Sequence, residues 1–310
     1  MLKRIGILGV LVFGAVFGLQ AQVEVSLEFK KDFFLAHEEM IAEVKIINYS
    51  GRTLTFGQDQ EWLQFTVESR NEFPVEKVGD LDIIEKFEIP NASRGIRRVH
   101  LVPTYKIDRP GRYRITAFIN VPELNMNKVT APVEIGLLSA TVIWERPVGV
   151  VMNEADPSAP IAVRKYFLMR AVNEKSIDLY VKVTDQYEKD IYGVYTLGNI
   201  VSFGEPERQV DRFSNLHVLM QNGARTFRYT IVKPDGKVLL RQKWAYSSTR
   251  PQLSLGKNGL IEVKGGQRQP SFEDIPTPEQ INEVRERNAE PVASTSSGSA
   301  ELTQSDSKQE

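Results

Sequence analysis

Apolar and polar residues alternate along most of the chain after residue 22. In the stretch VEVSLEF, residues 23–29, apolar side chains occupy every second position, and polar or charged ones lie between them. That period is typical of a half-buried strand. Similar short runs separated by turn residues follow at residues 40–48, 62–69, 82–89, 97–105, 113–121 and 128–135. Because no helical period interrupts them, we predict a β-sandwich over residues 22–137.

A second group of strands is predicted over residues 138–266. Its clearest part, residues 211–246, contains apolar runs joined by Asn222-Gly223 and by Asp235-Gly236. Such pairs tolerate the backbone conformations of tight turns, which predicts an antiparallel three-stranded meander. Similar short sequence patterns begin near residues 177, 215 and 259, and a spacing of about 40 residues is typical of blade-like hairpins. We therefore predict an all-β protein with a second antiparallel domain, and keep a stacked-sheet sandwich as the alternative for it.

The composition changes again from residue 267. The remaining residues are rich in Ser, Gln and Glu, and they contain too few apolar side chains to build a core. We predict a disordered acidic tail over residues 267–310. Within it Thr277 and Gln280 form a capping box around Pro278, which predicts a short helix over residues 278–288. That helix either docks weakly or folds on a partner.

The first 21 residues predict export. Lys3 and Arg4 precede an apolar run, and Ala21 ends a plausible cleavage site, so residues 1–21 resemble a secretory signal peptide. A retained membrane anchor is the alternative, although the run is short for a comfortable span. The chain contains no cysteine, which excludes disulfides, thiolate chemistry and anchoring through a lipid-modified cysteine. We expect a periplasmic or extracellular protein of a bacterium with no stable membrane span after cleavage.

The net charge and the histidine content limit the kinds of partner and of catalytic site that we expect. The net charge is −1, so no positive excess favours nucleic acid as a partner. The chain has 3 histidines, and none is spaced from another histidine or a carboxylate pair as metal ligands are. No nucleophile elbow is present. We accordingly expect no metal, no cofactor and no catalytic residue.

The second domain still holds candidates for ligand binding. Strand alternation places His217 on the face opposite Val218 and Met220, where it would face solvent or a groove. Aromatic residues could form a platform for a sugar or peptide, although core packing explains most of them. The candidate ligand-binding residues are Asp211, His217, Arg228, Tyr229 and Trp244.

Acidic residues of the second domain could serve in catalysis or in calcium binding. Paired carboxylates for glycoside hydrolysis could come from Asp178, Asp185, Glu188, Asp190 or Asp211. The acidic stretch 185–190 is interpreted as a solvated hairpin tip, because it lacks the ligand spacing and glycine of a calcium loop.

Two resemblances refine the fold. Residues 110–117 (PGRYRITA) and 46–54 (IINYSGRTL) are similar to strand segments of bacterial immunoglobulin-like domains, and this resemblance covers about residues 23–136. It implies that Tyr113 could bond a backbone carbonyl as in a tyrosine corner; a half-buried strand tyrosine is the alternative. More weakly, residues 177–263 resemble sialidase-type propeller repeats, which use arginine clusters on acidic sugars. Arg208, Arg212, Arg225, Arg228 and Arg241 do not match that arrangement in spacing.

The combined pattern predicts a non-enzymatic binding or structural module of the bacterial envelope, which recognises a protein or glycan through sheet surfaces, edges or loops. The first alternative is a sugar-recognising or glycoside-hydrolase-like protein with its site near Asp211 and His217. A second alternative is a subunit of an envelope assembly that docks through the helix predicted at residues 278–288.

Overall fold

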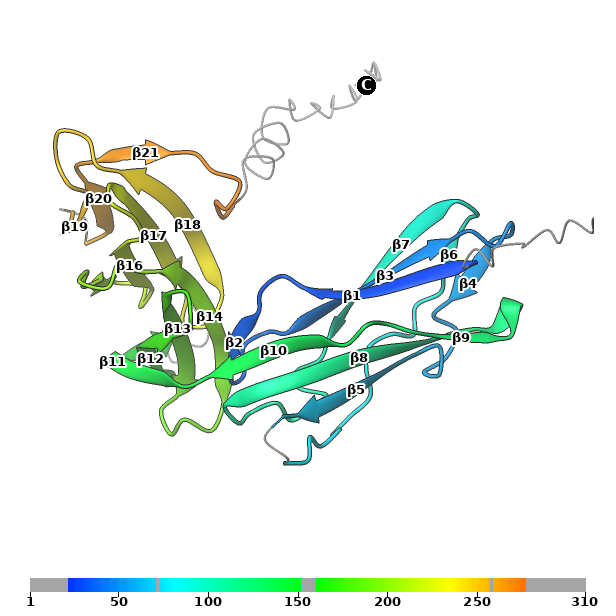
Figure 1. The fold of residues 1–310 in the computed structure, drawn as a ribbon. Helices are drawn as coiled ribbons and strands as arrows, with labels where there is room; N and C mark the ends of the chain where they lie inside the picture. Colours follow the sequence, from blue (N-terminus) through cyan, green and yellow to red (C-terminus); the bar gives the residue numbers. More distant parts are fainter. Residues whose placement is uncertain (1–21, 71–72, 152–159, 257–258, 277–310) are drawn as a thin grey trace, which may run out of the picture. The chain divides into compact units, whose positions relative to one another are not determined.

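The structure, a computed structural model, describes residues 22–70, 73–151, 160–256 and 259–276 (Figure 1). The described chain is nearly all β and mainly antiparallel, as predicted; η1 (Pro122–Leu124) is a short 3-10 helix. The chain divides into two compact units: unit 1 contains residues 1–147 and 163–198, and unit 2 contains residues 148–162 and 199–310. The predicted signal peptide and the predicted helix over 278–288 lie outside the described residues.

Unit 1 begins with two sheets that share one core. A three-stranded sheet has the order β1-β3-β7, and a five-stranded sheet has the order β2-β10-β8-β5 with β9 also on β8. A further pair is β4-β6. The strands are β1 (Val23–Phe29), β2 (Phe33–Leu35), β3 (Ile41–Asn48), β4 (Leu54–Phe56), β5 (Leu63–Ser69), β6 (Phe87–Ile89), β7 (Ser93–His100), β8 (Gly111–Val121), β9 (Met126–Val129) and β10 (Val133–Leu138).

Alternation builds this core as the sequence pattern predicts. Every second residue of β3 is buried, and β5 and β8 show the same period. Inward side chains of both sheets, including Val44, Phe65 and Ile115, belong to one apolar cluster. The two sheets therefore pack face to face and form a sandwich.

Three predicted strand boundaries shift, and prolines account for two of the shifts. The strand predicted at 97–105 is β7, which ends before the turn that contains Pro103. The strand predicted at 128–135 is divided into β9 and β10 around Pro132, because proline has no N–H for the ladder. At 82–89 only β6 is a strand.

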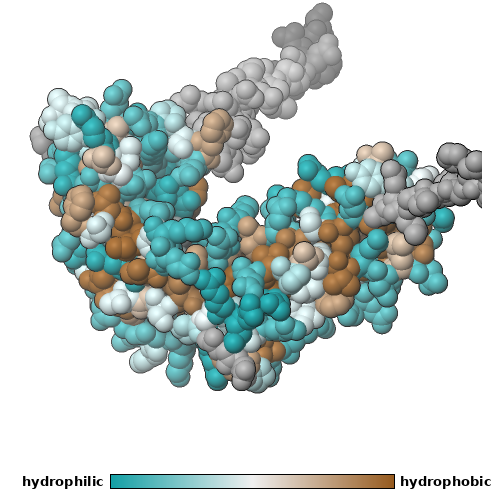
Figure 2. Space-filling view, in the orientation of Figure 1, coloured by the Kyte–Doolittle hydropathy of each residue, from teal (hydrophilic) through white to brown (hydrophobic). Residues whose placement is uncertain are grey.

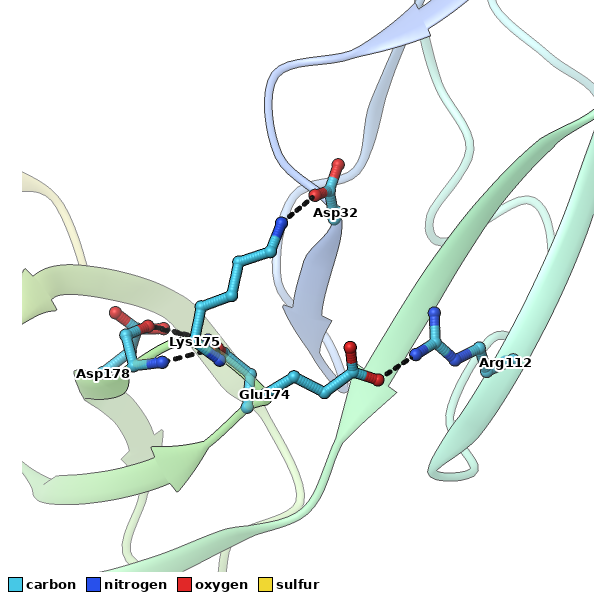
Figure 3. A network of polar contacts seen from close by, with 7 residues as sticks. Asp32, Arg112, Glu174, Lys175 and Asp178 are labelled. Carbon is cyan, nitrogen blue, oxygen red and sulfur yellow. Dashed lines mark hydrogen bonds and ion pairs between the residues drawn. The ribbon is translucent and has the colours of Figure 1, made fainter.

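The rest of unit 1 includes strands of the sheet β11-β12-β13-β14. These strands are β11 (Ala140–Val151), β12 (Ile161–Val172), β13 (Ile177–Asp185) and β14 (Ile191–Asn199). The turn between β12 and β13 contacts the sandwich through ion pairs: Glu174 pairs with Arg112, and Lys175 Nζ lies 3.6 Å from Asp32 Oδ2 (Figure 3). Because all four side chains are largely exposed, each pair contributes at most about 1 kcal/mol.

A buried carboxylate, Glu38, adds a second contact between the sandwich and this sheet, because it also accepts a hydrogen bond from the backbone of Thr196 in β14. Glu38 is 5% exposed, and it accepts hydrogen bonds from Lys31 Nζ at 2.5 Å and from the Leu35 amide at 3.0 Å. Burial raises its pKa, while Lys31 opposes that shift. Leu35 also packs into the apolar cluster of Phe167, Met169 and Tyr180. The polar contact thus connects the start of the sandwich to β14, and the apolar contacts connect it to β12 and β13.

Unit 2 contains a five-stranded sheet, β15-β16-β17-β18-β21, and a hairpin, β19-β20. Their bounds are β15 (Glu207–Val210), β16 (Leu216–Gln221), β17 (Thr226–Val232), β18 (Val238–Ala245), β19 (Gln252–Leu255), β20 (Ile261–Lys264) and β21 (Gln267–Gln269). The meander predicted at residues 211–246 is present as β16, β17 and β18. Gly236, in its second turn, has a φ of 82°, a conformation that glycine adopts without strain.

The similar sequence patterns near residues 177, 215 and 259 lie in three different sheets. The first is β13, an inner strand of a four-stranded sheet, and the second leads into β16, an inner strand of a five-stranded sheet. The last lies in the two-stranded β19–β20 hairpin, so it does not occupy an equivalent position. Figure 2 shows polar and apolar residues intermixed over the strands of the visible face.

Paired structure continues past residue 266, where the predicted tail was expected to begin. Strand β21 pairs with residues 243–245 of β18, and Ile275 forms a bridge with Arg241. A polar composition therefore did not prevent this segment from pairing with the edge of a sheet. The rest of the predicted disordered tail, from residue 277, lies outside the described residues.

Candidate functional site

Strand register divides the predicted site residues between two faces of the unit 2 sheet. His217 pairs with Ile231 and Leu219 pairs with Tyr229, so His217 and Tyr229 share one face. Phe227 pairs with Trp244, which places Trp244 on that same face. Arg228 pairs with Lys243 and therefore lies on the opposite face. The structure thus brings together Asp211, His217 and Tyr229, and separates Arg228 from them.

Asp211 forms a tight turn just after β15. Its Oδ1 accepts hydrogen bonds from the amides of Phe213 at 2.9 Å and Asn215 at 2.8 Å. Its Oδ2 accepts one from Asn215 Nδ2 at 3.0 Å and lies 3.2 Å from His217 Nε2. Asp211 acts here as a local turn former, which is a common structural role of aspartate.

His217 links Asp211 to Tyr229. Its Nδ1 lies 2.6 Å from Tyr229 Oη, and the side chains of His217 and Asp211 are each 5% exposed. Since an ionised carboxylate can only accept hydrogen bonds, neutral His217 carries its proton on Nε2 and accepts the Tyr229 hydroxyl proton at Nδ1. The network therefore satisfies both ring nitrogens internally.

Burial sets the protonation of this network. It lowers the pKa of His217, and Asp211 opposes the shift only in part. Burial also raises the pKa of Asp211, but hydrogen bonds from Asn215 and His217 outweigh it and keep that pKa below its usual value. The pKa of Tyr229 is raised by burial and by the Asp211 charge. At neutral pH the network holds one negative charge, on Asp211.

The predicted exposure of His217 is wrong. The prediction assumed that one face of β16 meets solvent, but residues 216–220 are all buried. The β19–β20 hairpin contributes Leu253 and Ile261 to an apolar cluster with Leu219 and Tyr229, on the face that carries His217. Alternation along one strand does not reveal that a hairpin later in the chain covers the polar face.

Arg228 lies in a pocket of about 250 Å³ on the other face. The pocket is closed by the segment after β21, whose Glu273 forms an ion pair with Arg228. Asp274 in the same segment pairs with Arg268 at 2.7 Å and accepts the Ser271 amide at 2.9 Å. The lining residues are Asn222, Thr226, Arg228, Arg241, Gln242, Lys243, Ser271, Glu273 and Asp274.

Sequence reasoning missed most of this pocket. Arg241 and Lys243 occur at a spacing of two on β18, which places them on one face. The sequence pattern could therefore have predicted that these two side chains lie together. The segment that closes the pocket could not be predicted in this way, because Ser271, Glu273 and Asp274 fall in a region predicted to be disordered.

The other candidates are dispersed. Trp244 is half-buried, and its Nε1 donates to Gln242 Oε1 at 3.3 Å. Asp185 accepts the amides of Tyr187 and Asp190, as expected of a hairpin tip. Arg212 and Arg225 lie over the rings of Phe213 and Tyr246. The candidates Trp244, Asp185, Arg212 and Arg225 do not line the pocket around Arg228.

Unit 1 has a pocket of its own, of about 380 Å³, which brings together His37, Glu39 and His100. His100 Nδ1 lies 3.2 Å from Glu39 Oε1, and both side chains are exposed. Across the residues that the structure describes, no group of histidine and carboxylate side chains is arranged to hold a metal ion. Within the same residues, no helix is long and apolar enough to cross a membrane.

Comparisons with known proteins do not identify a family for this chain. No protein-family profile matches the sequence, and no curated protein matches it significantly. A solved structure, the sporulation control protein Spo0M of Bacillus subtilis, is 8% identical and matches 53% of this chain and 80% of its own, with a TM-score of 0.29. That similarity is too low to support an inference about function.

Proposed function

We propose that this protein is an exported, non-enzymatic binding or structural module of the bacterial envelope. Its partner is a protein or glycan that it contacts through sheet surfaces, edges or loops. The export part of the proposal rests on the signal-like residues 1–21 and on the absence of cysteine from the sequence.

We also propose that the sandwich of unit 1 is immunoglobulin-like. Its strand orders, β1-β3-β7 and β10-β8-β5, correspond to the A-B-E and G-F-C arrangement of that fold. In addition, Tyr113 Oη donates a 2.6 Å hydrogen bond to the carbonyl of Arg109, the bond that a tyrosine corner requires. Domains of this kind host many unrelated functions, so the fold supports a binding role without naming the partner.

The main support for a non-enzymatic function is the buried hydrogen-bond network of Asp211, His217 and Tyr229. A general acid or base must reach its substrate directly or through one water. Here both ring nitrogens of His217 are engaged by buried neighbours, and Asp211 is occupied by backbone amides. These contacts support a structural role for the residues that most resemble catalytic ones.

The test uses the purified chain that begins at Gln22, with Asp211→Asn and His217→Gln as variants. We expect no turnover of chromogenic glycosides, and saturable co-sedimentation with isolated bacterial envelopes. Both variants should keep the envelope binding while losing about 1–3 kcal/mol of unfolding free energy, because each leaves a buried polar group without a partner.

Two outcomes would contradict the proposal. Turnover by the wild-type chain that both variants lose would favour the glycoside-hydrolase-like alternative, with its site at the network. Co-sedimentation that never saturates would exclude specific recognition of an envelope component. Unfolding measured by circular dichroism on the same samples separates lost binding from lost structure.

A further inference from the structure

The outward face of the five-stranded sheet in unit 1 carries an exposed aromatic side chain. Strands β5, β8 and β9 lie side by side, with β8 in the middle (Figure 1). Every second residue of β8 is buried in the sandwich core, so the residues between them point outward. Phe118 is one of these and is 40% exposed. Its cross-strand partners are Gln64 on β5 and Val129 on β9, and Val129 is 53% exposed.

Amide and hydroxyl groups surround this ring. Thr116 and Asn120 are the outward residues of β8 on either side of it. Thr116 is paired with Thr66 of β5, and Asn120 is paired with Asn127 of β9. These side chains are half-buried or exposed, and each can both donate and accept hydrogen bonds. We call the following set the Phe118 face: Gln64, Thr66, Thr116, Phe118, Asn120, Asn127 and Val129.

Charged residues of the same sheet gather beyond one end of the Phe118 face, where they pair with one another. Arg114 is the cross-strand partner of Glu68 on β5 and of Glu134 on β10. Glu134 Oε1 lies 2.7 Å from Arg70 Nη2 and 3.3 Å from Arg114 Nη2. Groups of both signs are thus engaged there, whereas the groups around the aromatic ring are neutral. This charge pattern favours a neutral ligand on the Phe118 face.

The size of the Phe118 face favours a small ligand over a protein. Three adjacent strands and residues 116–120 span about 10 Å by 14 Å, at about 4.8 Å between strands and about 3.4 Å per residue. A stable protein partner covers about 800 Å² on each side, which is several times this area. A few linked sugar rings match the dimensions of the face better.

A neutral oligosaccharide also has the matching chemistry. The C–H groups on one side of a sugar ring form an apolar surface that can pack on an aromatic ring, and its hydroxyls both donate and accept hydrogen bonds. The amides of Asn120 and Gln64 offer a donor and an acceptor side by side, which suits neighbouring hydroxyls. Because the inward residues of β5 and β8 belong to one buried cluster, the outward groups are held at fixed spacings, and little ordering is needed on binding.

We propose that the Phe118 face binds a neutral oligosaccharide, with Phe118 packed on a sugar ring and with Gln64 and Asn120 bonded to its hydroxyls. This inference rests on the binding role proposed above, and it specifies a glycan as the partner and unit 1 as the site.

The probes are maltotriose, cellotriose and chitotriose, neutral trisaccharides that differ in linkage and in N-acetylation. Each is titrated into the full chain from Gln22 by isothermal calorimetry, and trigalacturonate serves as an acidic comparison. We expect saturable binding of at least one neutral probe and weaker binding of trigalacturonate. Phe118→Ala should weaken the binding of that neutral probe at least about 10-fold, because the packing surface is lost. Gln64→Ala should weaken it about 3- to 10-fold, the effect of one lost hydrogen bond.

Ile96→Ala is the matched control. Ile96 lies on β7, in the other sheet of the sandwich, and is 42% exposed, close to the exposed fraction of Phe118. The variant removes an equally exposed apolar side chain from a different face, so it should bind the probe as the wild type does. Thr116→Arg keeps the aromatic ring but places a long charged side chain beside it, and it should also block binding. Thermal melts establish that each variant is folded before its affinity is compared.

Co-sedimentation with bacterial envelopes separates this inference from the proposed function. Probe binding that Phe118→Ala loses and Ile96→Ala keeps supports the inference. It is overturned if no neutral probe binds, if trigalacturonate binds as tightly, or if Phe118→Ala binds as the wild type does; saturable co-sedimentation of the wild type would then still support a binding role. Co-sedimentation that Phe118→Ala loses, and that protease treatment of the envelopes abolishes, would instead assign the face to a protein partner.

Discussion

Individual polar residues in this protein mostly serve to stabilise turns and buried contacts. Asn48 is completely buried, and its Nδ2 donates to the carbonyls of Arg52 at 2.7 Å and Ile89 at 2.9 Å. Asp211 organises the turn before β16 in a comparable way. Such residues resemble functional ones in a sequence, because the same side chains cap turns and bind ligands. Only their partners in the structure separate the two roles.

The buried histidine predicts a loss of stability in acid. Since the folded-state pKa of His217 lies below its ordinary value of 6.5, the unfolded chain takes up this proton first. The free energy of unfolding should therefore fall as the pH drops below about 6.5, by up to about 1.4 kcal/mol per pH unit from this residue. Urea unfolding at a series of pH values measures the slope.

In His217→Gln that part of the slope should disappear, although the variant is less stable throughout. The control is His100→Gln, an exposed position on β7, which should keep the wild-type slope. An unchanged slope in His217→Gln would show that other groups cause the acid sensitivity.

At the scale of elements, the edge of the unit 2 sheet depends on a segment with little apolar content. Strand β21 covers residues 243–245 of β18, and the Arg241–Ile275 bridge extends the contact. The Arg268–Asp274 ion pair, in which Asp274 is 4% exposed, fixes the turn between the two. Backbone pairing and a buried carboxylate, rather than side-chain hydrophobicity, hold this segment in place.

Truncation tests this boundary. A chain that ends at Pro276 should unfold with the same midpoint as the full chain, because it keeps β21 and the bridge. A chain that ends at Gly266 should lose several kilocalories per mole, since it removes the backbone hydrogen bonds of β21 and of Ile275, at about 1 kcal/mol each, and uncovers the edge of β18.

Differential scanning calorimetry compares the chains that end at Gly266, at Pro276 and at the natural end. Equal midpoints for all three would contradict the structural role of residues 267–276. Loss of stability in both truncated chains would instead assign a stabilising role to residues beyond 276.

At the scale of the whole molecule, the chain forms two compact β units, and the alternation of apolar residues in its strands supports each of them. Neither unit uses cysteine. A sandwich of this size can bury enough apolar surface to fold without disulfides. The same chain would accordingly be stable in an oxidising or a reducing compartment, so stability does not decide its location.

The proposed export depends on the signal-like first residues, and it predicts a defined mature end. We expect cleavage after Ala21, so that the protein recovered from a bacterial host begins at Gln22. Intact-mass measurement of the protein from periplasmic and membrane fractions identifies the end. A full-length mass in the membrane fraction would favour the retained anchor; replacing Ala21 with a bulky residue should block cleavage if the signal is recognised as predicted.

The sequence by itself determined the strand content, the turns and most strand positions of the sandwich and of the meander at 211–246. These features depend on local alternation and on turn residues such as Asn222 and Gly236, so neighbouring positions contain the information. It also named Asp211, His217, Arg228, Tyr229 and Trp244 as candidate ligand-binding residues, without separating the first, second and fourth from the other two. It did not determine whether they are exposed or buried.

The tertiary structure alone decided which faces are covered and which distant residues meet. The β19–β20 hairpin packs on the face of the sheet that carries His217, and residues 271–274 close the pocket at Arg228, although each lies more than 30 residues away in sequence. Local alternation predicts that a strand has two faces, but the cover over each face comes from segments whose position depends on the whole fold. For that reason the sequence did not show that Asp211, His217 and Tyr229 form a buried hydrogen-bond network. It also did not show the pocket that contains Arg228, Arg241 and Lys243.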